Sequence, residues 1–295
     1  MSNDSWGLQS GDAITEELTA MRSLGGGNAY EVFLAFDEVT YGPVVVKVVR
    51  PAQVSDKGTL RGLRREVTLL EDVRHPAVVR GLRSVVDGER PHLVLEHLEG
   101  PRLSTLVRRY GPLEPAQYLP LGIEVAAALH YFRRLGLVHL DVKPSNIIMG
   151  APAKLIDLSV ARAAEQAAGL TYPIGTDAYM APEQADPAAL GAPQAAADVW
   201  GLGATLYEAV AGHKPFPDGD PKAQEIARRF PQLVEDPLPM PEGVPDDVTK
   251  LVMAALERRP EDRPEPHALV DAFGPLLERL PRGRLSGFKN ALSAR

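Results

Sequence analysis

Cysteine is absent from the 295 residues of the chain. Disulfide bonds, thiolate zinc sites and a cysteine nucleophile are therefore excluded together. Because no disulfide is needed to hold the fold, we expect the reducing cytoplasm as its compartment. Long apolar runs are missing too. No stretch approaches the roughly 18 apolar residues that a membrane-spanning helix requires, and the first residues lack the basic and then apolar regions of a signal peptide.

Positive charge is in short supply. The 32 Lys and Arg residues against 39 Asp and Glu residues leave a net charge of −7. This balance argues against a general nucleic-acid binder, which needs clustered cations to displace counterions. The segment 276–295 is the exception, with five basic residues and one acidic residue. We expect it to be a solvated basic tail, with contact to an anionic surface as the alternative.

The first hundred residues have the pattern of strands with one helix. Residues 29–37 and 44–50 are rich in β-branched and apolar side chains and flank a Tyr-Gly-Pro turn, so they predict a hairpin. Between residues 60 and 73, apolar side chains recur at steps of three and four, which indicates an amphipathic helix. Residues 78–86 and 92–97 again read as strands.

Helical patterns dominate after the Glu-Gly-Pro at residues 99–101, which we interpret as a boundary between two lobes. Residues 115–135 carry apolar side chains on one side, and residues 198–211 are apolar nearly all round, as in a buried helix. The sequence therefore predicts an α+β fold: a small β-rich lobe with one main helix, and a larger, mostly helical lobe.

Two charged residues stand where apolar ones are expected. Lys47 has three valines before it and two after it in a predicted strand, and burying an unpaired ammonium is costly. Glu66 lies on the apolar side of the predicted helix, between Leu63 and Leu70. An ion pair between strand and helix would resolve both anomalies. The alternative for Lys47 is an outward-facing side chain on a half-exposed strand.

A polar loop lies between apolar segments further along the chain. Asp141, Lys143 and Asn146 fall within six residues, and Asp157 follows a short predicted strand. Two carboxylates and an amide oxygen suit a hard cation such as Mg²⁺. One carboxylate would hold the metal while the other accepts a proton from an attacking hydroxyl. Taken alone, either Asp is equally consistent with an ordinary turn residue.

The order of these features is more informative than any one of them. Along the chain they are a glycine-rich segment at 24–32, Lys47, Glu66, the loop at His139, Asp157 and Ala181-Pro182-Glu183. This series resembles the eukaryotic-like (Hanks-type) protein kinase family, most of all its bacterial serine/threonine members. The segments 198–203 and 259–264 also look like landmarks of that family's larger lobe.

The resemblance implies a two-lobed protein-kinase fold and a nucleotide-binding set. That set is Leu24, Gly25, Gly27, Val32, Lys47, Glu66, Glu96, Leu98 and Ile148. The two glycines would let backbone N–H groups approach phosphates. Lys47 would hold the α- and β-phosphates while paired with Glu66. The backbone of Glu96 and Leu98 would hydrogen-bond adenine at a hinge.

The resemblance also assigns the catalytic groups. Asp141 would be the catalytic base and Lys143 a cation that stabilises the phosphate. Asn146 and Asp157 would ligate Mg²⁺, or Mn²⁺ in its place, and ATP would be the co-substrate. Thr176 would bridge Asp141 and Lys143 from the substrate loop. Glu183 with Arg263 would form a structural salt bridge.

Three residues depart from the family's pattern. Tyr30 stands in place of the third glycine, Leu140 in place of an Arg that collects phosphate on the activation loop, and Ser159 in place of the glycine of Asp-Phe-Gly. Without that Arg, a phosphate on the loop loses its main cation. We therefore expect that activity does not require phosphorylation of Thr171.

The resemblance covers nearly the whole chain and sets the expected domain organisation. Residues 1–11 would be an N-terminal tail, residues 12–275 a kinase domain, and residues 276–295 the basic tail. Within the domain, the small lobe would span about 12–98 and the large lobe about 99–275.

The expected function is an ATP-dependent serine/threonine protein kinase acting on a protein substrate. The first alternative is a pseudokinase, a nucleotide-binding scaffold or allosteric regulator, because three departures accumulate in one chain. The second is a small-molecule phosphotransferase of the same architecture. A regulatory partner protein or a dimer would supply the input, and no nucleic-acid partner is expected.

Overall fold

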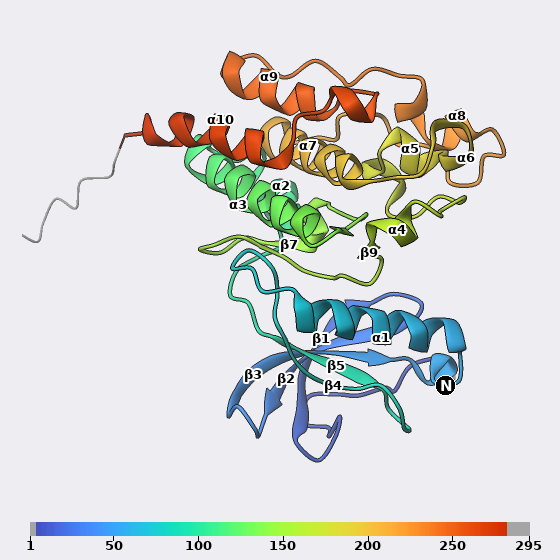
Figure 1. The fold of residues 1–295 in the computed structure, drawn as a ribbon. Coiled ribbons are helices and arrows are strands. Elements are labelled where there is room, and N and C mark those ends of the chain that lie inside the picture. Colours follow the sequence, from blue (N-terminus) through green and yellow to red (C-terminus); the bar gives the residue numbers. More distant parts are fainter. Residues whose placement is uncertain (1–3, 282–295) are drawn as a thin grey trace, which may run out of the picture.

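Five antiparallel strands form the sheet of the smaller lobe, in the order β1-β2-β3-β5-β4 (Figure 1). Their bounds are Leu18–Gly26 (β1), Tyr30–Asp37 (β2), Gly42–Val49 (β3), Gly81–Val85 (β4) and His92–Glu96 (β5). The computed structural model describes residues 4–281. Helix α1, Lys57–Asp72, lies along this sheet on the side that faces the larger lobe.

The β2–β3 hairpin gives the sheet two different faces. Burial alternates along β2, and the register pairs Val32 with Lys47. Phe33 and Val46 belong to an apolar cluster on one face, together with Leu18 of β1. Because neighbouring residues of a strand point to opposite faces, Lys47 is directed to the other face, toward the larger lobe.

Helix α1 begins where the sequence provides a cap. The carboxylate of Asp56 accepts a hydrogen bond from the backbone N–H of Thr59 at 2.6 Å, which satisfies one of the unpaired donors of the first turn. Leu63, Glu66 and Leu70 are buried on its inner face. Glu66 is therefore a carboxylate inside an otherwise apolar seam.

The larger lobe is built from long helices together with several helices of only four residues. Its helices are α2 (Leu103–Tyr110), α3 (Pro115–Arg134), α4 (Ala164–Ala167), α5 (Pro182–Ala185), α6 (Pro187–Leu190), α7 (Ala195–Ala211), α8 (Ile226–Arg229), α9 (Asp246–Ala255) and α10 (Pro266–Glu278). Nearly every side chain of α7 is buried, because α3 and α9 pack against it (Figure 1).

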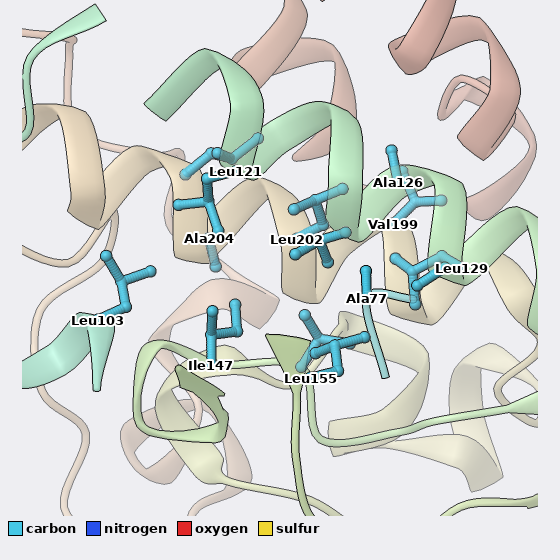
Figure 2. Packing of buried hydrophobic residues seen from close by; sticks show 14 of the residues in the cluster. Ala77, Leu103, Leu121, Ala126, Leu129, Ile147, Leu155, Val199, Leu202 and Ala204 are labelled. Carbon is cyan, nitrogen blue, oxygen red and sulfur yellow. The ribbon is translucent and has the colours of Figure 1, made fainter. Parts of the chain in front are cut away.

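Two short two-stranded sheets lie in the larger lobe. They are β6 (Leu137–Val138) with β9 (Arg162–Ala163), and β7 (Ile147–Ile148) with β8 (Lys154–Leu155). Figure 2 shows Ile147 and Leu155 packed under Leu202 of α7 and Leu129 of α3. The loops next to β7 and β8 are therefore anchored to the core of the larger lobe.

The predicted two-lobed α+β fold is confirmed, including the first hairpin and the main helix of the small lobe. The sequence did not indicate β1, and α7 begins three residues before the predicted 198. In the segment expected to be an N-terminal tail, Trp6 and Leu8 pack against the outer cluster of the sheet. Residues 282–295 of the expected basic tail lie outside the described residues.

Within residues 4–281, none of the helices combines the length and the apolar character that crossing a membrane demands.

One buried ion pair joins distant parts of the larger lobe. Arg263 donates from Nη1 and Nη2 to the two carboxylate oxygens of Glu183, at 2.6 and 2.9 Å, and both side chains are almost completely buried. The same guanidinium donates to the carbonyls of Ala196, Glu257 and Arg258. Every charge in this pair is thus matched by hydrogen bonds.

We expect Arg263→Ala to lower the free energy of unfolding by about 3–5 kcal/mol, because Glu183 would remain buried without a cation. Urea denaturation followed by circular dichroism measures the change. Arg259→Ala is the matched control, since its partner Glu261 is exposed and water already weakens that pair. Unchanged stability of the Arg263 variant would contradict the role given to the buried pair.

Candidate active site

A cavity of about 470 Å³ lies between the two lobes. The sheet lines it with Val32, Leu34 and Val45, and the larger lobe with Ile148 and Ile156. Its polar lining includes Lys47, Glu66, Asn146 and Asp157. An apolar slot with a few converging polar groups is the usual form of a small-molecule site.

The two charged anomalies of the small lobe meet in this cavity. The Nζ of Lys47 lies 2.7 Å from Oε2 of Glu66 and 3.0 Å from Oδ1 of Asp157. Glu66 is 1% exposed, Lys47 9% and Asp157 39%. One ammonium therefore ties together the sheet, α1 and a loop of the larger lobe.

Lys47 and Asp157 keep their charges through the ion pairs of this group, whereas burial raises the pKa of Glu66 above its ordinary value. Burial favours the neutral amine, but the carboxylates of Glu66 and Asp157 raise the pKa of Lys47 above its ordinary value. Burial likewise favours neutral Asp157, but the Lys47 ammonium lowers the pKa of that carboxyl below its ordinary value. Lys47 and Asp157 are thus ionised at neutral pH.

A buried carboxylate fixes the loop that precedes Asp141. Asp198 of α7 accepts hydrogen bonds from the backbone N–H groups of His139 and Leu140, each at 2.7 Å. Leu140 has a φ of 64°, a conformation that costs free energy for a residue other than glycine. The two hydrogen bonds hold this conformation in place. Sequence reasoning placed Asp198 in a landmark segment but gave it no role.

Asp141 lies in a hydrogen-bonded cluster that joins two loops. Its Oδ2 accepts from Nζ of Lys143 at 2.7 Å and from Nδ2 of Asn146 at 3.0 Å, and its Oδ1 accepts from Oγ1 of Thr176 at 2.7 Å. Lys143 donates to Thr176 as well. The cluster orients the carboxylate and supplies a cation beside it. The structure thus brings together Asp141, Lys143 and Asn146, the three residues expected to be catalytic, with Thr176 of the expected substrate loop.

The oxygen donors in the cavity fit a metal that arrives with a phosphate. Among residues 4–281, no group of three or more His, Cys, Asp or Glu side chains could hold a metal ion. Asn146 and Asp157 both line the cavity. No group of the described protein hydrogen-bonds to Oδ2 of Asp157, since Lys47 and the N–H of Ser159 both use Oδ1. Mg²⁺ prefers such a set, with phosphates and water completing its shell.

The connection between the lobes presents an open backbone donor. Leu98 lines the cavity, and no acceptor for its N–H occurs in the described part of the chain. The carboxylate of Glu96 is held in ion pairs with Lys154 at 2.6 Å and Arg80 at 3.3 Å. This leaves the hinge backbone available to a flat heterocycle such as adenine.

The turn between β1 and β2 needs its glycines for a reason the sequence did not single out. Gly25 and Gly26 have φ values of 97° and 155°. A Cβ on Gly26 would lie 2.2 Å from the carbonyl oxygen of Tyr30, whereas one on Gly25 or Gly27 would meet nothing within 4 Å. The turn therefore requires glycine at position 26, where any side chain would collide with the backbone. Positions 25 and 27 have free space around them. Leu24 reaches the cavity and these two glycines do not line it.

Two of the three departures are accommodated locally. Leu140 is 2% exposed and packs in the core of the larger lobe. Ser159 has no left-handed φ, so its position does not require glycine here. Its carbonyl accepts from Nη2 of Arg65 in α1 at 2.7 Å. This bond attaches the loop after Asp157 to α1.

These features are what the resemblance to the protein kinase family implies: a hinge with an open N–H, a paired lysine in the sheet and a carboxylate-lysine cluster on the facing lobe. The chain belongs to the protein kinase family: the model of the protein kinase domain matches residues 18–272. The resemblance expected from the sequence is therefore confirmed.

Several similar curated proteins are bacterial serine/threonine kinases. The serine/threonine-protein kinase PknB of Mycobacterium leprae is 32% identical over 252 residues, which is 81% of this chain and 39% of that protein. The serine/threonine-protein kinase PkaB of Streptomyces coelicolor is 34% identical over 262 residues, which is 85% of this chain and 60% of the relative. The matched region thus spans about two fifths of the length of the PknB relatives.

We expect Asp198→Asn to destabilise the fold by about 1.5–3 kcal/mol, because an amide N–H₂ would face a backbone N–H in a buried position. Chemical denaturation measures this loss. Asp246→Asn, at the exposed start of α9, is the control. If the two variants unfold at the same urea concentration, the Asp198 carboxylate does not hold the loop.

Proposed function

We propose that this chain is a serine/threonine protein kinase domain that transfers the γ-phosphate of ATP to protein hydroxyls. The observation that carries the proposal is that Asn146 links the Asp141 cluster to a cavity in which Lys47 is paired with Glu66 and Asp157. The names of the bacterial relatives support the same reaction. The proposed domain is 12–275, with the small lobe over about 12–98 and the large lobe over about 99–275.

In the proposed reaction, the substrate hydroxyl oxygen attacks the γ-phosphorus. The bond from that phosphorus to the β–γ bridging oxygen breaks, and ADP leaves. The hydroxyl proton passes to the carboxylate of Asp141, which Thr176 and Asn146 hold in a fixed orientation. Most of the rate enhancement would come from this positioning, because phosphoryl transfer needs little covalent help.

Two lysines of the chain and a bound metal ion would share the charge neutralisation in this proposal. Lys47 would hold the α- and β-phosphates, and Lys143 would neutralise charge that develops on the transferred phosphoryl group. Asn146 and Asp157 would hold Mg²⁺, or Mn²⁺, which would supply further positive charge to the phosphates. Leu24, Val32 and Ile148 would enclose the adenine, with its edge bonded to the backbone of Glu96 and Leu98.

The proposal includes the expectations about context. The substrate would be a protein, the compartment a reducing cytoplasm, and a partner protein or a second copy of the chain would supply the regulatory input. The pseudokinase alternative was motivated by Tyr30, Leu140 and Ser159. The paired Lys47 and the oriented Asp141 favour the active enzyme over it.

We expect labelled phosphate from ATP with Mg²⁺ to appear on Ser or Thr of a generic basic protein. Asp141→Asn should reduce this transfer by about 10²–10⁴-fold, because the proton acceptor is lost. Thermal stabilisation by ATP should persist in that variant, since Asp141 does not line the cavity.

Equal transfer by the two proteins would rule out Asp141 as the base. ATP-dependent stabilisation without transfer in either protein would favour the pseudokinase. Label on a small metabolite but on no polypeptide would favour the small-molecule phosphotransferase.

We expect Thr171→Ala to keep its transfer rate within about twofold, because Leu140 offers no charge to a phosphate on the loop. Thr171 is exposed, and its replacement should leave the core intact. Initial rates together with mass spectrometry of the loop test this. Phosphate on Thr171 in the unchanged protein, combined with a large loss of rate in the variant, would contradict the expectation.

A further inference from the structure

The third departure from the family's pattern, Tyr30, has specific partners. Its hydroxyl donates to the backbone carbonyl of Thr59 in the first turn of α1, at 3.1 Å. The Nζ of Lys47 lies 4.6 Å from the centroid of its ring. One side chain at the start of β2 therefore contacts both α1 and the lysine of the buried triad.

The position of Tyr30 on β2 explains these contacts. Tyr30 and Val32 are two residues apart and so point to the same face of the sheet. Val32 lines the cavity, whereas Tyr30 does not. Tyr30 thus leaves the cavity open and covers Lys47 from the side of α1. Gly62 of α1 lies beside the Tyr30 hydroxyl, and a Cβ there would be 3.4 Å from the hydroxyl oxygen.

The environment of the ring matches its chemistry. Tyr30 is partly buried, and burial raises the pKa of its phenol above the ordinary value, so the hydroxyl remains a donor at neutral pH. The face of an aromatic ring attracts a cation, most strongly where water is excluded, and Lys47 is 9% exposed. Both contacts are therefore attractive in the arrangement in which Lys47 is paired with Glu66.

We propose that Tyr30 is a positioning residue that locks α1 and Lys47 in the ion-paired arrangement. This inference rests on the proposed function. A movement of α1 away from the sheet would separate the Tyr30 hydroxyl from Thr59 and would separate Glu66 from Lys47. Both contacts are lost in the same movement, so the tyrosine selectively stabilises the arrangement in which Lys47 is paired with Glu66. We call this the competent arrangement.

The Tyr30 contacts would take over a role that Leu140 cannot play, namely stabilising the competent arrangement. A loop phosphate held by an Arg at that position would be one way to stabilise the competent arrangement, and Leu140 cannot provide it. The Tyr30 contacts lie within the small lobe and need no modification. The resting protein is therefore held in the competent arrangement by its own side chains.

The test compares Tyr30→Phe and Tyr30→Leu with the matched controls Tyr41→Phe and Tyr41→Leu. Tyr41 is 79% exposed at the β2–β3 turn. Tyr30→Phe removes the bond to Thr59 and keeps the ring, and Tyr30→Leu removes both contacts. Hydrogen exchange of residues 57–66, the rate of Lys47 acylation measured by mass spectrometry, and kcat and KM for ATP are the readouts.

We expect exchange in α1 to be about threefold faster in Tyr30→Phe and about tenfold or more faster in Tyr30→Leu, with kcat falling in proportion to the competent fraction. Acylation of Lys47 should accelerate in Tyr30→Leu and much less in Tyr30→Phe, because the ring still covers the amine. The KM for ATP should change less than kcat. The Tyr41 variants should match the unchanged protein in every readout.

Exchange and acylation rates that are the same in all four variants would overturn the inference. So would a loss of kcat without faster exchange in α1. Exchange and acylation are measured without any phosphate transfer. If they respond as expected in a protein that transfers no phosphate, the lock stands and the proposed kinase function fails.

Discussion

A buried ammonium needs a carboxylate, and much of this structure follows from how Lys47 satisfies that need. The side chain lies among valines, where an unpaired charge would be costly. Lys47 forms ion pairs with Glu66 of α1 and with Asp157 of the larger lobe. The position of the helix relative to the sheet, and of the lobes relative to each other, is therefore tied to a single nitrogen atom. The cavity between the lobes lies around this contact.

The larger lobe applies the same logic away from the cavity. The Asp198 carboxylate is buried in α7 and is satisfied by the backbone N–H groups of His139 and Leu140. Glu183 is buried in α5 and is satisfied by Arg263. Each buried charge can be accommodated only in one arrangement of its neighbours, since an unpaired one would be strongly unfavourable. The loops that carry Asp141 and Thr176 are thus held by electrostatics within a helical core.

The sequence revealed the parts of the site that conflict with their local pattern. Lys47 inside a valine run and Glu66 on an apolar helix face are anomalies, and pairing them predicted a strand–helix contact. Asp198 was missed as a support because a carboxylate in a helix gives no sign of which backbone it meets. Gly26 was missed because its need for glycine comes from the carbonyl of Tyr30, a contact set by the turn geometry. Local periodicity cannot carry such information.

The departures from the family's pattern are better understood together than separately. Leu140 replaces a charge with a buried apolar side chain, Ser159 fits a backbone that does not need glycine, and Tyr30 replaces a glycine with a side chain that bonds α1. Arg65 of α1 donates to the backbone carbonyl of Ser159, a bond that does not depend on the serine side chain. Tyr30 thus attaches α1 more firmly, while Leu140 offers no charge to a phosphate on the loop. The Tyr30 contacts hold α1 in place without a phosphate on the loop. This is consistent with a kinase whose ion-paired arrangement is stabilised by its own side chains.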